Sequence, residues 1–290
     1  MFERRAYLLD MTRRVPTMRT AQELIDVLAR YRYNEFRPFV EKEFPEGIDF
    51  GKLGAYCEMQ GVEMVRTTRS EFEELFIEAE YAIVSTEAER SLAGRVEDMR
   101  EQMIRAEAQG RTRKAKGFLV TDFADECCWQ PLAVSLPGII MGGNFASGGA
   151  KSSMMDLEKE LDRVMEAPLG GLLLRLGTLY LRGGAPHDRV SELFIILSHD
   201  VGYSRHPGLT QFVLDDISGV AHGVRLAAER WVDRSDWAKE IVYAANLLDC
   251  ACHRRNEAML RELRDEHGHV WRLRFLPEGR VESLSKLPRF

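Results

Sequence analysis

Carboxylates follow the apolar segments of this sequence at positions suited to acid–base chemistry. Asp10, Glu41 and Asp122 each stand at the end of a strand-like run. Asp125-Glu126 is an adjacent acidic pair shortly after the last of these. Parallel strands deliver the residues at their carboxyl ends to one functional face, so we expect these acids to meet in a cleft. Clustered acids shift one another's pKa values apart, which allows a protonated acid and an ionised partner to coexist.

Other residues near these acids have both a binding and a structural interpretation. Trp129 has an aromatic face and a polar edge, which suits a sugar ring, but the same side chain could pack in the core. Asp122 and Asp125 could instead accept backbone N–H bonds that hold loops together. Arg5 could form a structural ion pair with Asp10 or Asp122.

Histidine and cysteine are placed unfavourably for other catalytic chemistry. All seven histidines lie at or after His187, which disfavours a Ser–His–Asp or Cys–His triad in the strand-rich half. The pair Cys127-Cys128 and the group formed by Cys250, Cys252 and His253 would point their side chains in different directions. The sequence therefore predicts no metal site, and nothing in it requires a cofactor.

Strand-like and helix-like segments alternate up to about residue 145. The strand-like runs are Ala6–Met11, Glu35–Glu41, Val62–Thr67, Tyr81–Thr86 and Gly117–Asp122. The helical patterns between them are Ala21–Arg32, Phe50–Gln60 and Ser91–Gln109, and Thr68–Glu80 has room for one more helix. This alternation predicts βαβ units and a parallel sheet.

The number of units is too small for a complete barrel. Only about five βα units fit, whereas a closed eight-stranded barrel usually takes about 250 residues. The sheet must therefore close tightly, stay open with a covered edge, or be completed by another subunit.

The second half of the chain has a helical pattern. Apolar residues recur at three- and four-residue spacing in Met155–Met165, Leu169–Tyr180, Val190–Ser198, Thr210–Val232 and Trp237–His267. We therefore predict an α/β fold, with an incomplete TIM-like parallel barrel over residues 1–150 and an all-helical region over residues 151–290. Gly142-Gly143 and Gly148-Gly149 predict a linker or rim loop between the two.

Several segments resemble the catalytic barrel of glycoside hydrolase family 20, the β-N-acetylhexosaminidases. Arg5–Met11, Val15–Thr20 and Tyr33–Phe36 are similar to the opening of that barrel, Gly54–Val65 to its next helix and strand, and Tyr81–Arg95 to its penultimate strand. Gly117–Pro137 resembles the last strand, where relatives carry Asp-Trp-Gly-Asp followed by Trp-Gln-Pro. The resemblance covers most of the chain. It implies a TIM-like barrel, saccharide binding, and an arginine, here Arg5, that binds sugar hydroxyls.

The sequence departs from this family at the residues that carry its chemistry. The family's acid is the Glu of an Asp-Glu pair on the fourth barrel strand, and the Asp orients the acetamido group that acts as nucleophile. The region for strands four to six is absent here, and the pair is absent with it. Phe123 and Ala124 replace Trp and Gly. Loss of the acid would remove a contribution of about 10²–10⁴-fold to the rate.

We therefore expect a protein that has lost standard hexosaminidase catalysis and binds a saccharide, a related polar ligand or a protein partner. One alternative is an active hydrolase of N-acetylhexosaminides with a rebuilt carboxylate site. Another is a structural homo-oligomer whose sheet is finished across a subunit interface. The candidate catalytic residues are Asp125 and Glu126, and the candidate substrate-binding residues are Arg5, Asp10, Glu41, Asp122 and Trp129.

Composition limits the partners and the compartment. A formal net charge of −6 disfavours a nucleic-acid surface, and no run approaches the roughly 20 apolar residues of a membrane span. The start of the chain lacks the apolar core of a signal peptide, and five cysteines make a poor disulfide framework. The sequence therefore predicts a cytoplasmic protein with no nucleic-acid or membrane partner.

Overall fold

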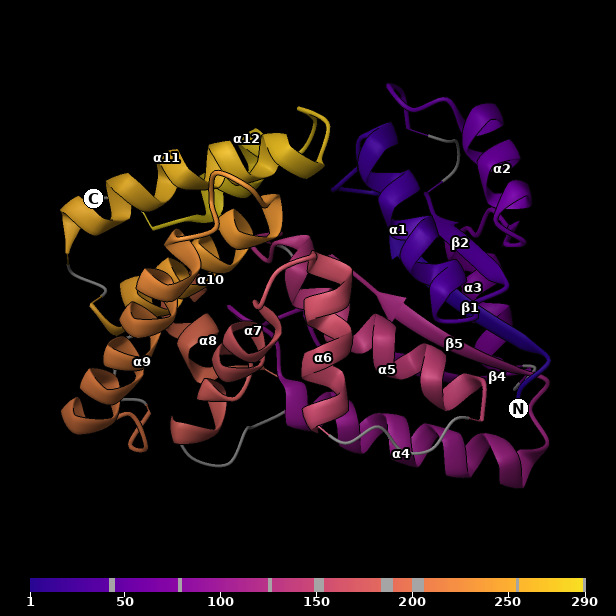
Figure 1. The fold of residues 1–290 in the computed structure, drawn as a ribbon, viewed down its shortest axis with the longest axis horizontal. Coiled ribbons are helices and arrows are strands. Elements are labelled where there is room, and N and C mark those ends of the chain that lie inside the picture. The colour runs from indigo at the N-terminus through magenta and orange to yellow at the C-terminus, as the bar shows by residue number, and fades with distance from the viewer. Residues whose placement is uncertain are drawn as a thin grey trace.

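The computed structural model of the chain describes residues 1–41, 45–77, 80–124, 127–148, 154–183, 190–199, 206–253 and 256–288. The fold is mixed α/β. Figure 1 shows the strands at one end of the longest axis, beside the amino terminus, and the last helices at the other end. The predicted order of a strand-rich half followed by a helical half is confirmed.

Within the described residues, five parallel strands form one sheet in the order β3-β2-β1-β5-β4. The strands are β1 (Arg4–Asp10), β2 (Glu35–Phe39), β3 (Glu63–Met64), β4 (Tyr81–Ser85) and β5 (Gly117–Asp122). β1 is central, because it pairs with both β2 and β5. The described part of the chain contains no ladder between β3 and β4, so these strands form the two edges of the sheet.

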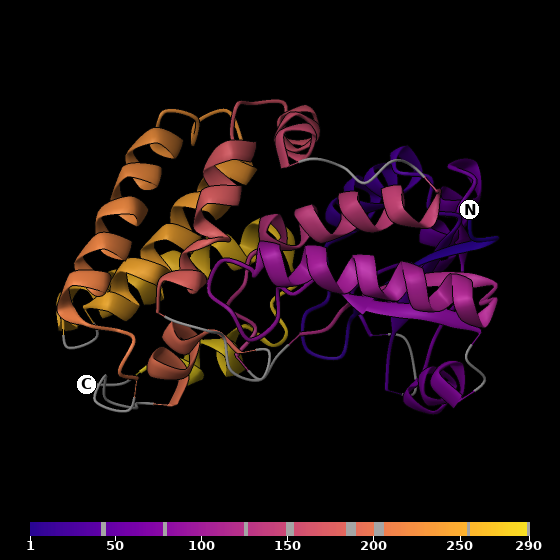
Figure 2. The same ribbon diagram turned by 90° about the horizontal axis from the view of Figure 1, so that it is seen from below.

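Most helices of the first half cover one face of the sheet. They are α1 (Met18–Arg30), α2 (Phe50–Met59), α4 (Val96–Arg113) and α5 (Leu136–Ala146). Their apolar residues share a core with Tyr7 and Leu9 of β1 and with Phe118 and Val120 of β5. Figure 2 shows α4 and α5, in magenta and pink, running along the same side of the strands.

A single helix of this half, α3 (Arg69–Ile77), packs against the opposite face. There, Phe72 and Leu75 contact a small cluster that includes Leu8 and Leu119. The side follows from the strand order. The connections β1 to β2, β2 to β3 and β4 to β5 all move in one direction across the sheet, whereas the connection from β3 to β4 moves in the other. Since crossovers are right-handed, α3 must lie on the other face.

Helix α5 corrects the prediction that Gly142-Gly143 belongs to a linker or rim loop. Both glycines lie inside this buried helix. A Cβ atom on Gly142 would stand 2.3 Å from Val120 Cγ2 and 2.5 Å from Tyr33 Oη. Glycine is needed here because α5 lies directly on the sheet. The two glycines therefore permit close packing of a helix rather than forming a loop.

The second half is built from helices. They are α6 (Met154–Met165), α7 (Gly170–Leu176), α8 (Glu192–His199), α9 (Gln211–Glu229), α10 (Asp236–Cys252), α11 (Glu257–Arg274) and α12 (Arg280–Lys286), with the 3₁₀ turn η2 (Leu179–Gly183); a further 3₁₀ turn, η1 (Leu132–Ser135), precedes α5 in the first half. The predicted helix over 237–267 is two helices, α10 and α11. Asn256 caps α11 by accepting the N–H of Met259 at 3.2 Å, which starts a new helix.

Buried charges join the two halves. Arg274 of α11 pairs with Glu240 of α10, and its Nη1 lies 2.6 Å from Glu23 Oε2 of α1. The guanidinium also lies 3.8 Å from the ring centroid of Trp237, and Glu240 accepts the N–H of Ala133 at 2.7 Å. One hydrophobic core runs through both halves.

Candidate functional site

A cleft of about 1250 Å³ opens at the carboxyl ends of the strands, on the side covered by α3. Its floor comes from the segments that follow β1 and β5, and its walls come from α3, α8 and the end of α12. The lining includes Asp10, Thr12, Glu41, Phe72, Phe76, Phe123, Ala124, Phe194, Ile195 and Lys286. Ligands of parallel α/β folds bind at this end of the strands.

Asp10 lies on the cleft floor, where the sequence predicts it, with 5% of its surface exposed. Its Oδ1 accepts the N–H and the hydroxyl of Thr12 at 2.9 and 2.7 Å. Its Oδ2 accepts the N–H of Ala124 at 3.2 Å. The carboxylate therefore holds the segment after β1 against the segment after β5, and it shapes the floor of the cleft.

Asp122 does not reach this cleft. Neighbouring residues of a strand point to opposite faces, and Asp122 points toward the face that α5 covers. It is 1% exposed, and it accepts hydrogen bonds from Tyr7 Oη at 2.7 Å and from Thr86 Oγ1 at 3.2 Å. Burial, with the nearby Asp122 charge, raises the pKa of Tyr7. The role of Asp122 is to satisfy two buried side-chain hydroxyls, whereas the structural interpretation expected it to accept backbone N–H bonds of loops.

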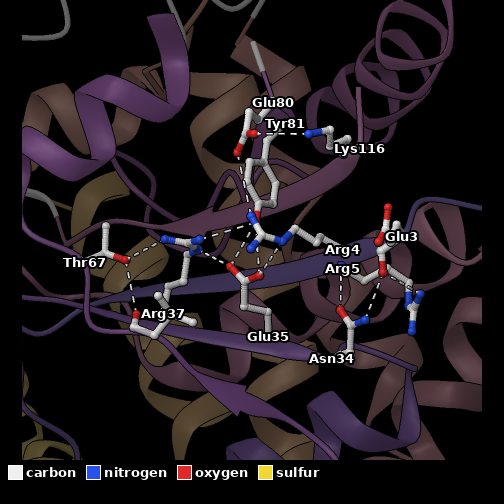
Figure 3. A network of polar contacts seen from close by, with 11 residues as sticks. Glu3, Arg4, Arg5, Asn34, Glu35, Arg37, Thr67, Glu80, Tyr81 and Lys116 are labelled. Carbon is white, nitrogen blue, oxygen red and sulfur yellow. Dashed lines mark hydrogen bonds and ion pairs between the residues drawn. The ribbon is translucent and has the colours of Figure 1, made fainter. Parts of the chain in front are cut away.

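Arg5 lies at the amino end of β1, away from the cleft. Its guanidinium donates to the main-chain carbonyls of Arg32, Phe2 and Glu3. Figure 3 shows it beside Asn34, which bonds to its main-chain N–H. Burial, followed by the charge of Arg32, lowers the pKa of Arg5. Arg5 ties the first strand to the turn before β2, and the expected ion pair with Asp10 or Asp122 is replaced by bonds to carbonyl groups.

Trp129 packs in the core rather than facing a ligand. The residue is 1% exposed, and its ring centroid lies 5.9 Å from that of Phe194. Its Nε1 donates to the carbonyl of Ser283 in α12 at 3.2 Å. Because α8 and α12 both line the cleft, Trp129 supports two of its walls from behind.

The remaining predicted acids divide into two cases. Glu41 is exposed and lines the cleft. Asp125 and Glu126 lie outside the described residues, although Ala124 and Cys127 on either side of them line the cleft. Of the five described candidates, the structure therefore brings Asp10 and Glu41 together and places Arg5, Asp122 and Trp129 elsewhere.

A cluster of phenylalanines in the cleft was not predicted. The Phe72 ring centroid lies 6.0, 5.3 and 5.2 Å from those of Phe39, Phe76 and Phe123, with steep interplanar angles in every pair. Phe76 is 59% exposed. The spacing of Phe72 and Phe76 indicates one side of a helix. The face of the sheet that receives this helix follows only from the strand order.

The start of α3 is fixed by a local sequence signal that was also missed. Thr68-x-x-Glu71 has the capping-box pattern. Glu71 Oε2 accepts the N–H of Thr68 at 2.6 Å and its hydroxyl at 2.8 Å. These hydrogen bonds lower the pKa of Glu71. The capping interaction therefore orients the helix that carries Phe72 and Phe76.

A second polar cluster lies under α3, nearer the amino ends of the strands (Figure 3). Tyr81 Oη lies 3.0 Å from Glu35 Oε2, and Arg37 pairs with the same carboxylate. Arg37 also donates to Thr67 Oγ1 at 3.0 Å. Burial raises the pKa of Tyr81. These side chains satisfy one another's hydrogen-bonding groups on the face of the sheet that α3 covers. We therefore assign the cluster to stability rather than to ligand binding.

No protein-family model matches the chain, and neither does any curated protein. Across the described ranges, no group of three or more His, Cys, Asp or Glu side chains could hold a metal ion. The same ranges contain no single helix long and apolar enough to cross a membrane, although the bent pair Asp156–Met165 and Gly170–Gly183 passes that test by length and composition when taken together.

Proposed function

We propose that this chain binds a saccharide in the strand-end cleft and does not carry out standard hexosaminidase catalysis. The observation that carries the proposal is the position of the cleft. It lies at the carboxyl ends of parallel strands and is lined by Asp10 and Glu41, two of the acids that the sequence predicts there. Aromatic rings on one wall and charged groups around the floor suit a ligand with both apolar faces and hydroxyl groups.

The strand order supports an incomplete barrel. In an eight-stranded parallel barrel each strand neighbours the next one in sequence, and the last strand returns to the first. An arc made of the first three and the last two strands would have the order 3-2-1-8-7. The observed order, β3-β2-β1-β5-β4, has this connectivity. The resemblance to family 20 assigns the same five segments to those positions, so the two lines of reasoning agree.

The engagement of Asp10 and Asp122 supports binding without hydrolysis. Asp10 already accepts three hydrogen bonds from the protein, and Asp122 is buried on the other face of the sheet. A general acid must reach the oxygen of the leaving group. Neither of these carboxylates is placed for that role, and the family's own acid pair is absent from the sequence.

Ligand-dependent thermal unfolding and calorimetric titration test the proposal. We expect N-acetylglucosamine, N-acetylgalactosamine or a thiazoline mimic of the cyclised intermediate to raise the unfolding midpoint, because a ligand that binds only the folded state stabilises it by mass action. Glu41→Gln should weaken binding, whereas Glu58→Gln, an exposed substitution in α2, should not. A flat response to every sugar would refute saccharide binding and favour a protein partner.

Hydrolysis of 4-nitrophenyl N-acetyl-β-D-glucosaminide tests the alternative that the chain is an active hydrolase. We expect no release of nitrophenol above background. Release that disappears in Asp125→Asn or Glu126→Gln would establish a rebuilt acid site instead. The homo-oligomer that completes the sheet stays a prediction, and the mass of the protein in solution tests it.

A further inference from the structure

The cleft combines an aromatic cluster with charged groups at the strand ends and on α3. The rings of Phe39, Phe72, Phe76 and Phe123 pack edge to face, with centroid separations of 5.2 to 6.0 Å. This arrangement makes a rigid apolar surface without a hydroxyl or N–H group to meet a sugar. Phe76 stands at its rim and is largely exposed.

Helix α8 provides a second apolar wall. Val190, Phe194 and Ile195 line the same cleft as Phe72 and Phe76. Phe194 is fixed from behind by Trp129, at 5.9 Å between ring centroids. The acids Asp10 and Glu41, in contrast, line the cleft where β1 and β2 end. A ligand in the cleft therefore meets acids at the strand ends and aromatic and aliphatic side chains between α3 and α8, where Arg69 and Glu73 of α3 also line the cleft.

Phe76 also connects the cleft to a narrow groove beside the edge strand β4. This groove has a volume of about 160 Å³, and its lining includes Phe76, Ile83, Ala106 and Ala115. Phe76 therefore borders both spaces, although Gln109 and Arg113 make the lining of the groove partly polar. The cleft itself, at about 1250 Å³, exceeds the roughly 300–1,000 Å³ of sites for drug-sized ligands, so one hexose would leave much of it unfilled.

From these features we infer that the ligand is an amphipathic glycoside, with its sugar at the strand ends and an apolar aglycone between α3 and α8. This inference rests on the proposed saccharide binding and adds the chemical class of the second half of the ligand. An alkyl or aryl group would cover Phe76 and the α8 wall and so remove their apolar surface from water. This burial contributes favourably to the binding free energy, and a free sugar lacks that contribution.

A series of n-alkyl N-acetyl-β-D-glucosaminides, from methyl to octyl, tests this inference by calorimetric titration below their micelle concentrations. Each methylene that becomes buried should tighten binding about fourfold. The matched n-alkanols, which lack the sugar, form the second arm. We expect the octyl glycoside to bind more tightly than both the methyl glycoside and octanol.

Variants locate the apolar subsite. Phe76→Ala should weaken the octyl glycoside by about tenfold and leave the methyl glycoside unchanged, because only the aglycone reaches that ring. Phe76→Leu should restore most of the loss. Phe212→Ala in α9 removes an even more exposed ring away from the cleft and should change neither affinity.

The possible results separate the two proposals. Equal affinity for methyl and octyl glycosides would overturn the apolar subsite and leave saccharide binding intact. Equal affinity for octanol and the octyl glycoside would overturn saccharide binding and leave the apolar subsite intact. Failure of both series to bind would overturn both proposals. An effect of Phe212→Ala equal to that of Phe76→Ala would place the aglycone elsewhere.

Discussion

At the scale of single residues, burial shifts the pKa values of Glu266 and His267, which are neighbours in α11, in opposite directions. Burial raises the pKa of Glu266 to about 7 and lowers the pKa of His267 to about 4. The His267 ring lies between Tyr243 Oη at 2.7 Å and Ser283 Oγ at 3.0 Å. The folded state therefore keeps a proton on Glu266 that the unfolded chain loses. The folded state also leaves His267 neutral at pH values where the unfolded chain binds a proton there.

The pH dependence of stability follows from these two signs. For Glu266, the folded state binds more protons between about pH 4.5 and 7, so its contribution to stability falls as pH rises through that window. For His267, the unfolded state binds more protons between about pH 4 and 6.5, so stability falls as pH is lowered through that window. The two contributions partly cancel in the native protein.

Glu266→Gln should remove one of these two opposing contributions to the pH dependence of stability. We expect the variant to gain stability relative to the native protein as pH rises from about 5 to 8, by up to about 3 kcal/mol, because the cost of ionising a buried carboxyl is removed. Urea unfolding at several pH values measures the difference. Glu262→Gln, an exposed position of the same helix, is the control and should show no such trend. A pH-independent difference for Glu266→Gln would contradict this assignment.

The buried pair at the junction of the halves should be costly to break. Glu240→Ala leaves Arg274 buried without its main partner and leaves the N–H of Ala133 unpaired, so we expect a loss of about 3–5 kcal/mol in the free energy of unfolding. Glu101→Ala removes the exposed partner of Arg105 and should cost less than about 1 kcal/mol. Comparable losses for the two variants in chemical denaturation would disprove the structural role of Glu240.

At the scale of elements, α3 has the most consequence for function, because it carries the aromatic wall of the cleft. Its first turn depends on the bonds between Glu71 and Thr68. We expect Glu71→Ala to lower the free energy of unfolding by about 1 kcal/mol. Glu74→Ala, one turn away and exposed, provides the comparison in thermal unfolding. Equal stability of the two variants would show that the capping interaction contributes nothing.

The elements also show what a sequence can and cannot predict. The predicted strand over Gly117–Asp122 matches β5 in full, because an apolar β-branched run between a charged turn and a carboxylate is a local signal. α5 was missed because Gly142 and Gly143 have a packing role that depends on Val120 and Tyr33, which are distant in sequence. Asp122 was placed on the wrong face, because a position at a strand end does not reveal which way the side chain points.

At the scale of the whole molecule, the two predicted halves share one core. The cluster of buried apolar residues extends from β1 through α5 to α10 and α11, and α1 pairs with α11 through Glu23 and Arg274. A boundary at residue 150 therefore separates two architectures but does not separate two independent cores. Composition alone could not reveal this, since the contacts across the boundary join segments more than 200 residues apart.

This shared core predicts a single unfolding transition. Far-ultraviolet circular dichroism, which reports all helices, and the fluorescence of the four tryptophans should change at the same temperature. Calorimetry should give equal van't Hoff and calorimetric enthalpies. Two resolved transitions would show that the strand-rich and helical halves unfold separately.

The crossing of α3 from one edge of the sheet to the other sets a limit on the length of the chain. Four strand spacings of about 4.8 Å separate β3 from β4, and the chain must also return along the length of a strand, about 17 Å. The nine residues of α3 cover about 14 Å, and the segments beside it must span the rest. These distances set a minimum length for the connection from Met64 to Tyr81. Added residues only lengthen this connection, so we expect whole strand–helix units inserted at this junction to be tolerated.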